Sequence, residues 1–298
     1  MELGQIAVFV GFGLAYALLI PRQWRAWALF LASLLAMYWL QPTLSIRWLD
    51  YSLPTGTLAL ACVGWWLTRG KEQTFSRQDG LALLLALGVV VLLALARYVD
   101  IPSALRLTSR PPELGGVLLA LALLFGLVWA AHRLGRGHSW PLLVGLLALL
   151  AIFIVVKMPA LAQALAAVLR AQAGQDAALA SALDVEWLGF SYVAFRLIHT
   201  LRDRQMGLLP DLSLRDYLTF VIFFPAYTAG PIDRAERFQA DVLALTALHG
   251  WDAARISEGL GRVAVGMGKK FILADSLALI ALNSQNAAQA QGAGGLWL

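Results

Sequence analysis

The sequence is divided into apolar blocks, each about as long as the span of a lipid bilayer. Six such blocks, at 4–20, 26–40, 53–68, 81–98, 114–131 and 141–158, are separated by short basic or Pro/Gly-containing stretches. A helix of about 20 apolar residues crosses the roughly 30 Å of hydrocarbon in a bilayer, and it pairs its own backbone groups while doing so. The fold is therefore expected to be all-α, a polytopic transmembrane helical bundle.

The composition supports the same fold class. Hydrophobic residues make up 60% of the chain and charged residues 14%, whereas ordinary soluble domains have about 45–50% apolar and about 25% charged residues. The net charge of +5 comes from Lys and Arg placed singly in short loops, which indicates membrane topology and not nucleic-acid binding. The small excess in alternate loops favours an N-terminus outside the cytoplasm. Cys62 is the only cysteine, which excludes an intrachain disulfide and a thiolate metal cluster, and no metal site is expected.

Three segments of different amino-acid composition follow one another along the chain. Residues 1–158 carry the N-terminal transmembrane helices, and residues 159–184, rich in Ala and Gln, form a linker that is expected to lie at the membrane interface. In residues 185–298 the apolar blocks begin to contain ionisable residues and prolines at membrane depth. Ionisable groups in such places are costly and usually functional, so function is expected in the third segment.

A polar stripe runs along the helix expected between residues 187 and 203. Tyr192, Arg196, His199 and Asp203 are spaced four, three and four apart, which places them on one helix face. A charge facing lipid costs on the order of 3 kcal/mol, so the stripe should face protein or a water-filled cavity. Two interpretations remain open: the stripe lines a functional site, or it pairs internally, with Arg196 held by a neighbouring carboxylate.

The next apolar segment is too short to span the membrane as a regular helix. Ser213 and Asp216 form a capping box that predicts a helix start, and Pro225 and Gly230-Pro231 prevent the helix from continuing. About ten helical residues reach only about half of the hydrocarbon thickness. Interrupted backbone at that depth is tolerated only beside protein or a water-filled cavity, so the bundle is expected to contain interrupted helices beside a substrate passage.

A charged run follows the interruption directly. Asp233 and Arg234 either line the mouth of the passage or lie in a solvated loop, and the sequence leaves both interpretations open. The candidates for lining the passage come from the polar stripe, the interruption and this run: Ser191, Tyr192, Arg196, His199, Pro225, Gly230, Pro231, Asp233 and Arg234.

Two stretches, WLGFSYVAFRLIHTLRD at 187–203 and FFPAYTAGPIDRAERF at 223–238, resemble the membrane-bound O-acyltransferase (MBOAT) family. The resemblance rests on a Gly-Phe-Ser-Tyr block, an Arg-Asp pair, a Phe-Phe-Pro element and a Gly-Pro-Ile-Asp-Arg element, which start at residues 189, 202, 223 and 230. Within the family the branch of teichoic acid D-alanylation is the most similar, followed by the alginate O-acetyltransferases. The N-terminal half matches only as hydrophobic spans.

The resemblance implies an acyl transfer reaction across the membrane. An acetyl or D-alanyl group would move from a cytoplasmic thioester, carried by phosphopantetheine on a carrier protein or by coenzyme A, to a hydroxyl of an extracytoplasmic cell-envelope polymer. It also implies a multi-pass protein of the bacterial cytoplasmic membrane, with no bound cofactor and no nucleic acid. The implied partners are membrane lipid, an acyl carrier protein and an extracytoplasmic acyltransferase partner.

The family's catalytic histidine, thought to activate the acceptor hydroxyl, lies well downstream of the Gly-Pro-Ile-Asp-Arg element. None of the four histidines matches that position: His132, His138, His199 and His249. The chain is therefore expected to be an N-terminal portion of such an enzyme, apparently truncated and inactive alone, and its catalytic residues are unknown.

Two other functions remain open. A secondary transporter would also contain broken helices and intramembrane charges, but it should show a second broken segment in an inverted half, and the N-terminal half offers none. A non-catalytic membrane scaffold is the other. The last apolar stretch, 256–282, is expected to be a further span that packs through its glycines, with Lys269 and Lys270 near a membrane face.

Overall fold

The apolar blocks form helices in the computed structural model, which describes residues 3–70, 73–100, 106–135, 140–228, 230, 233–247 and 253–281. These helices begin and end within four residues of the predicted blocks: α1 Leu3–Leu19, α2 Arg22–Leu40, α3 Leu49–Thr68, α4 Arg77–Leu95 with the 3₁₀ turn η1 Ala96–Tyr98, α5 Leu114–Gly135 and α6 Trp140–Lys157. The described residues contain helices and connecting segments but no strand. The predicted all-α class is therefore confirmed.

Helices continue through the rest of the chain, in shorter pieces. They are α7 Pro159–Gln172, η3 Ala177–Leu179, η4 Ala182–Val185, α8 Phe190–Gln205, α9 Leu214–Val221, η5 Phe224–Ala226, α10 Ala235–Ala247, α11 Ala253–Met267, the π-helical stretch η6 Gly268–Ala274 and α12 Asp275–Ile280. Two compact units follow from the internal contacts, Met1–Leu248 and His249–Leu298. The sequence analysis divides the chain after residues 158 and 184 by differences in composition, and that division stays a prediction.

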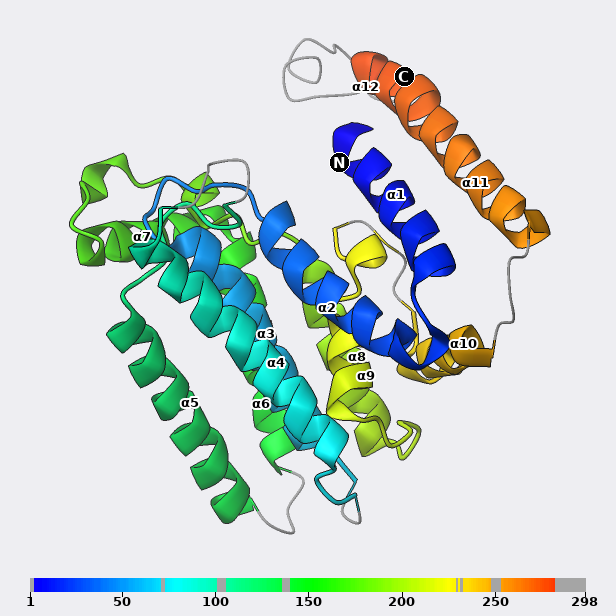
Figure 1. Cartoon of the computed structure of the whole chain (residues 1–298). Coiled ribbons are helices and arrows are strands. Elements are labelled where there is room, and N and C mark those ends of the chain that lie inside the picture. Colours follow the sequence, from blue (N-terminus) through cyan, green and yellow to red (C-terminus); the bar gives the residue numbers. More distant parts are fainter. Residues whose placement is uncertain are drawn as a thin grey trace, which may run out of the picture. The chain divides into compact units, whose positions relative to one another are not determined.

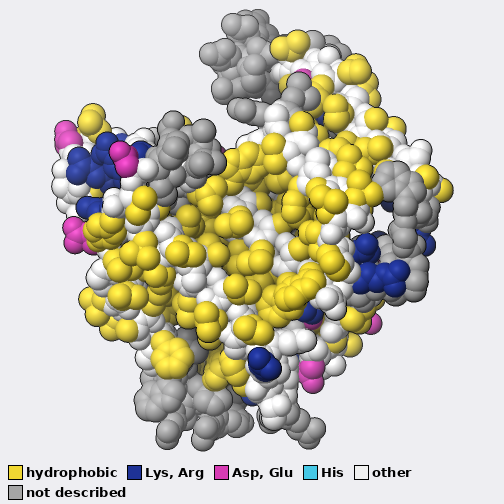
Figure 2. Space-filling model, in the orientation of Figure 1, with side chains coloured by type: hydrophobic (Ala, Val, Ile, Leu, Met, Phe, Trp, Pro, Cys, Tyr) yellow, Lys and Arg dark blue, Asp and Glu magenta, His cyan; other side chains and the backbone are white. Residues whose placement is uncertain are grey.

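Part of the helical surface suits a lipid environment. Two helices, Arg77–Tyr98 and Trp140–Lys157, are long and apolar enough to cross a membrane, and Gly4–Leu19 and Leu114–Gly126 are shorter apolar helices. Large apolar side chains on α4, α5 and α6 are exposed, among them Leu84, Leu92, Leu123, Phe125 and Leu147. Figure 2 shows apolar side chains over the middle of the visible face of the first unit and basic side chains nearer its margins. The number of spans remains a prediction.

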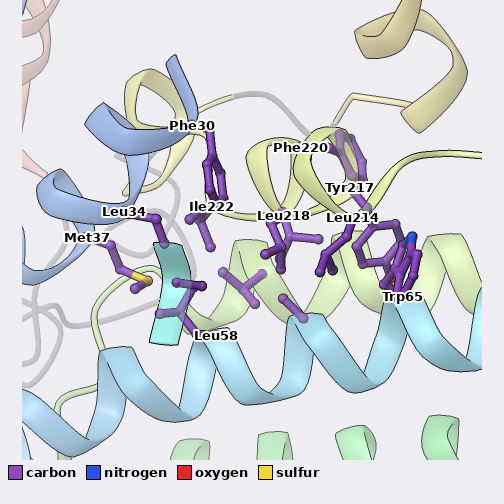
Figure 3. Close-up of a cluster of buried hydrophobic side chains, with 14 of the residues drawn as sticks. Phe30, Leu34, Met37, Leu58, Trp65, Leu214, Tyr217, Leu218, Phe220 and Ile222 are labelled. Atoms are coloured by element: carbon purple, nitrogen blue, oxygen red, sulfur yellow. The ribbon is translucent and has the colours of Figure 1, made fainter. Parts of the chain in front are cut away.

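The core of the first unit is built around the short helix α9. Six of the eight α9 residues are buried, and α9 contacts α2, α3, α4, α8 and α10. Figure 3 shows Leu214 and Leu218 of α9, and Ile222 just after it, in one buried cluster with Leu34 of α2 and with Leu58 and Trp65 of α3. In Figure 1, α8 and α9 lie beside the longer helices of the first unit. The two segments singled out from the sequence therefore occupy the middle of the packed core.

The 159–184 segment packs as a small structure of its own. Ala166 of α7 and Val185 of η4 join Ile46, Leu49 and Leu53 in a second apolar cluster. Beside this cluster Arg170 and Asp184 form a buried ion pair in which Nε donates to Oδ2 at 2.6 Å.

The Arg170–Asp184 pair predicts a pH-dependent stability for this segment. The hydrogen bond from Arg170 lowers the pKa of the Asp184 carboxyl, and the bond from the Ser181 backbone N–H adds to this effect. Because the folded pKa is below the ordinary value of 3.8, the stabilisation is complete at neutral pH and is lost as the pH falls through the folded pKa.

We therefore expect Asp184→Asn to lower the unfolding temperature at neutral pH, with the difference from the wild type shrinking in acid. A series of thermal unfolding curves from neutral pH to about pH 3 would measure this. Asp176→Asn is the matched control, because Asp176 is exposed and an amide can keep its hydrogen bond to the Ala178 N–H. A gap for Asp184→Asn that is constant with pH would contradict the assignment.

Candidate functional site

The chain leaves the helical conformation after Val221, in the middle of the core. The Ile222 N–H still bonds to the Leu218 carbonyl at 2.9 Å, but Pro225 has no donor and disfavours helix in the residue before it. Phe224–Ala226 then form the single 3₁₀ turn η5, and the next helix starts at Ala235. The predicted interruption is therefore present, and it leaves several carbonyls of the last α9 turn without helical partners.

Arg196 of α8 donates hydrogen bonds to carbonyls at this interruption. Its Nη1 donates to the carbonyl oxygens of Phe220 at 3.2 Å and Val221 at 2.9 Å, and its Nη2 donates to that of Ala226 at 2.9 Å. The guanidinium carbon also lies 5.9 Å from the centroid of the Phe220 ring. Arg196 is only 2% exposed. Of the two interpretations left open by the sequence, the one in which a carboxylate holds Arg196 directly differs from the structure: backbone oxygens bind the guanidinium, because the interruption places them within reach of its planar, forked donor group.

Side chains from other helices bind the remaining backbone groups around α9. Ser33 of α2, fully buried, accepts from the Phe224 N–H at 3.4 Å. Asp79 of α4, 1% exposed, accepts from the Leu214 N–H at 2.7 Å and also caps its own helix through Ser76. Ser213 accepts from the Asp216 N–H at 3.2 Å, as predicted, although the Asp216 carboxylate accepts from the Ser213 hydroxyl at 2.7 Å. Both ends of α9 are thus held by buried polar groups.

Glycines allow the two motif stretches to approach each other closely. Gly189, the residue before α8, has a φ of +71°, and a Cβ there would lie 2.7 Å from the Tyr227 carbonyl oxygen and 2.9 Å from its ring. A Cβ on Gly230 would lie 2.1 Å from the Cβ of Ala226. Only glycine fits both sites. The contact between Gly189 and Tyr227 packs the Gly-Phe-Ser-Tyr block directly against the segment after Phe-Phe-Pro, whereas the contact between Gly230 and Ala226 lies within that segment.

The other candidates on α8 are less tightly held. Ser191 and Tyr192 are half-buried, and within the described residues their side chains make no hydrogen bond. Nδ1 of His199 lies 2.9 Å from Oδ2 of Asp203, but this contact lacks hydrogen-bond geometry and is an ion pair only when the imidazole is protonated. All of the predicted stripe lies on α8, yet Arg196 alone of the four reaches the interruption.

The candidates after the interruption lie at or near the surface. Pro225 and Arg234 are exposed. Asp233, whose side chain is 36% exposed, accepts from the Arg234 N–H at 2.9 Å, lies 4.0 Å from Arg237 Nε and attracts Arg196 electrostatically. Pro231 lies outside the described residues. A hollow of about 150 Å³, counting space open to solvent, lies at the other end of α9 and contains none of the predicted residues; Trp65, Thr68, Arg69, Gln73, Arg204, Leu209, Pro210, Leu212 and Tyr217 line it.

Several residues that fix this junction were missed from the sequence. Ser33 and Asp79 lie in the N-terminal half, and so does Gln41, which donates to the Glu186 carbonyl at 2.9 Å and accepts from the Leu188 N–H at 3.2 Å just before α8. Ser33 and Gln41 are lone polar residues in or at the edge of an apolar block, and Asp79 ends the polar run that starts at Ser76. Their burial beside a distant segment is what distinguishes them, and a single polar residue gives no periodic signal of that.

Replacing Arg196 should destabilise the first unit. Arg196→Met keeps much of the volume but leaves three buried carbonyls unpaired, at about 1 kcal/mol or more each, so we expect a loss of about 3 kcal/mol. Arg196→Lys should lose less, because one ammonium can satisfy some of the oxygens. Denaturant unfolding of the purified protein in detergent measures both.

Arg202→Ala is the control for the Arg196 variants. Arg202 lies on the same helix, but it is exposed and contacts Gln205 at 3.3 Å. Its replacement should change the unfolding free energy by about 0.5 kcal/mol or less. Equal losses for Arg196→Met and Arg202→Ala would show that the three carbonyl contacts add no stability.

Gly189→Ala and Gly207→Ala together separate backbone strain from crowding. Both glycines have positive φ, +71° and +72°, but a Cβ at Gly207 meets nothing within 4 Å. Gly207→Ala should therefore lose about 1–2 kcal/mol of stability, from the left-handed conformation alone. Gly189→Ala should lose clearly more, because Tyr227 must also move. Similar losses in thermal or chemical unfolding would contradict the close packing of the two stretches.

Comparisons with known proteins give matches to one kind of enzyme over part of the chain. Teichoic acid D-alanyltransferase of Streptococcus thermophilus is 39% identical over 57 residues, which is 19% of this chain and 14% of that protein. The protein of the same name from Lacticaseibacillus rhamnosus is 40% identical over 55 residues, 18% of this chain and 14% of that protein. The one from Bacillus subtilis is 32% identical over 90 residues, 30% of this chain and 22% of that protein.

The matched stretches thus span about a seventh to a fifth of the length of these relatives. No family model and no solved structure matches the chain. The relatives support the predicted relationship to MBOAT-like acyltransferases, and at that general level they support a transferase activity.

Proposed function

We propose that the chain is a multi-pass MBOAT protein of the bacterial cytoplasmic membrane that transfers an acyl group to a cell-envelope polymer. The donor is a cytoplasmic thioester, on carrier-protein phosphopantetheine or coenzyme A, and the acceptor is a hydroxyl on the outer side. The observation that carries this proposal is the local identity of 32–40% to three proteins named teichoic acid D-alanyltransferase. Their name favours D-alanyl over acetyl as the acyl group.

The junction between α8 and η5 supports the proposal physically. A reaction between a donor and an acceptor on opposite sides of a bilayer needs a confined path that keeps water away from the thioester. An interrupted helix is one of the few ways to bring polar backbone to membrane depth, provided that the surrounding protein satisfies it. Here the protein does so through Arg196 and Ser33, and it places the partly exposed Asp233 next to the interruption.

The roles of the candidate residues differ accordingly. Arg196 shapes the site by holding the backbone, so we assign it positioning and not contact with the acyl group. Ser191, Tyr192, His199, Asp233 and Arg234 retain half-buried or exposed polar groups, and we propose them as contacts for the substrates. Carrier protein, lipid and an extracytoplasmic acyltransferase are the proposed partners.

The proposed reaction is tested by the ester content of the cell envelope. A strain with the gene disrupted should lose D-alanine esters from its envelope polymer, and supplying the gene in trans should restore them. Loss of acetyl esters instead would keep the reaction class and change the acyl group. Unchanged esters of both kinds would overturn the proposal and leave the transporter or scaffold function.

Within that assay, we predict that Asp233→Asn lowers acyl transfer by about tenfold, the effect of about 1.4 kcal/mol on the reaction barrier. The loss of a negative charge beside the interruption is the physical reason, and the unfolding temperature should stay unchanged because Asp233 is partly exposed. Asp241→Asn, an exposed position on α10, is the matched control and should keep full transfer. Full transfer by Asp233→Asn would remove Asp233 from the site.

A further inference from the structure

The helix α11 of the second unit has two chemically distinct faces. Ile256, Leu260, Val263 and Met267 are spaced four, three and four apart and therefore lie on one face. The charged residues Arg255, Glu258 and Arg262 follow a spacing of three and four on the opposite side, where Arg262 and Glu258 form an ion pair at 2.6 Å. A surface helix with this pattern normally covers its apolar face.

That apolar face is open within its own unit. The side chains of Leu260 and Val263 are 44% and 38% exposed. The charged residues Arg255, Glu258 and Arg262 are exposed as well. Among the described residues of the unit, Ile256 and Met267 are half-buried but Leu260 and Val263 stay exposed, so part of the apolar face is available to an apolar phase or partner.

The π-helical stretch η6, Gly268–Ala274, extends the basic face. In a π-helix the bonds run from i to i+5, so each residue turns by less than the about 100° of an α-helix. With this smaller step Lys269 and Lys270 stay on the side of Arg255, Glu258 and Arg262. The ion pair between Lys270 and Asp275, five residues apart, fits this wider turn.

We propose that α11 lies flat in the membrane–water interface, with its apolar face among the acyl chains and its basic face against anionic lipid headgroups. Four basic and two acidic residues lie between 253 and 280, which gives the stretch from α11 to α12 a net positive charge that complements an anionic surface. Amphipathic helices with this character lie in the interface plane and do not span. This proposal for α11 differs from the expectation that 256–282 spans the membrane.

A lipid partner requires the membrane location proposed above, so the test reports on both. Cys62 is the only cysteine, and a Cys62→Ala background allows single cysteines to be placed at each position from 255 to 267 of the full chain and spin-labelled. In vesicles of phosphatidylcholine and phosphatidylglycerol, accessibility to oxygen and to a water-soluble nickel chelate then measures the depth of each label.

We expect the depth to oscillate with a period of 3.6 residues around a constant mean, with labels at Leu260 and Val263 deep and labels at Glu258 and Arg262 at headgroup level. A depth that changes steadily along the helix on every face would show a spanning helix. Water-like accessibility at all positions would show contact with neither lipid nor its interface. Low accessibility to both reagents on the apolar face would show a covering protein segment. Each of these three results overturns the proposal.

Labels at Leu84 and Leu92 of α4, both exposed, are the controls for membrane location. If they lie at hydrocarbon depth while α11 shows no oscillation, the inference about α11 fails and the membrane location stands. If they are water-accessible, the membrane location itself fails. The oscillation should weaken in pure phosphatidylcholine and in the double variant Arg255→Gln, Arg262→Gln; an oscillation independent of both would overturn the role of anionic lipid.

Discussion

The fold of the first unit depends on how the backbone around α9 finds hydrogen-bond partners inside an apolar core. An eight-residue helix leaves most of its terminal N–H and C=O groups unpaired, and each one that stays unpaired in an apolar setting is costly. Arg196 satisfies two carbonyls at the C-terminal end of α9 and a third in η5, and Asp79 accepts an N–H at the N-terminal end of α9. A carboxylate at the start and a guanidinium at the end also match the direction of the helix dipole.

This arrangement explains why the two motif stretches belong together. Arg196 comes from the stretch that contains Gly-Phe-Ser-Tyr, and two of its acceptors, Phe220 and Val221, end the helix before Phe-Phe-Pro, while the third, Ala226, lies just after it. Gly189 and Tyr227 add a contact that a side chain at residue 189 would block. The two stretches that carry the resemblance to acyltransferases therefore pack into one structural unit.

The sequence predicted the helices well and the polar partners poorly, for different physical reasons. Apolar blocks of about 20 residues define their own helices, which is why 26–40 and α2, or 141–158 and α6, nearly coincide. The interruption was also predictable, because Pro225 and the Gly230-Pro231 pair act locally. By contrast, Ser33 and Asp79 accept hydrogen bonds from backbone N–H groups that lie far away in the sequence, at separations of 191 and 135 positions. Such pairings depend on tertiary packing, and the backbone partners of Arg196 were not predictable because the freed carbonyls exist only once α9 ends at Val221.

The polar stripe on α8 thus contains two kinds of residue, buried and hydrogen-bonded or partly exposed. The helical spacing in the sequence does not distinguish them. The guanidinium of Arg196 donates to three backbone oxygens and is attracted by the Asp233 carboxylate. Few of its donors are therefore left for a substrate that must enter and leave. His199 and Asp203, with side chains 30% and 14% exposed, face each other at 2.9 Å without a hydrogen bond. Groups of the second kind can exchange partners during a reaction. For the proposed reaction the partly exposed polar groups are therefore the better candidates for substrate contact, and the buried arginine is the better candidate for positioning.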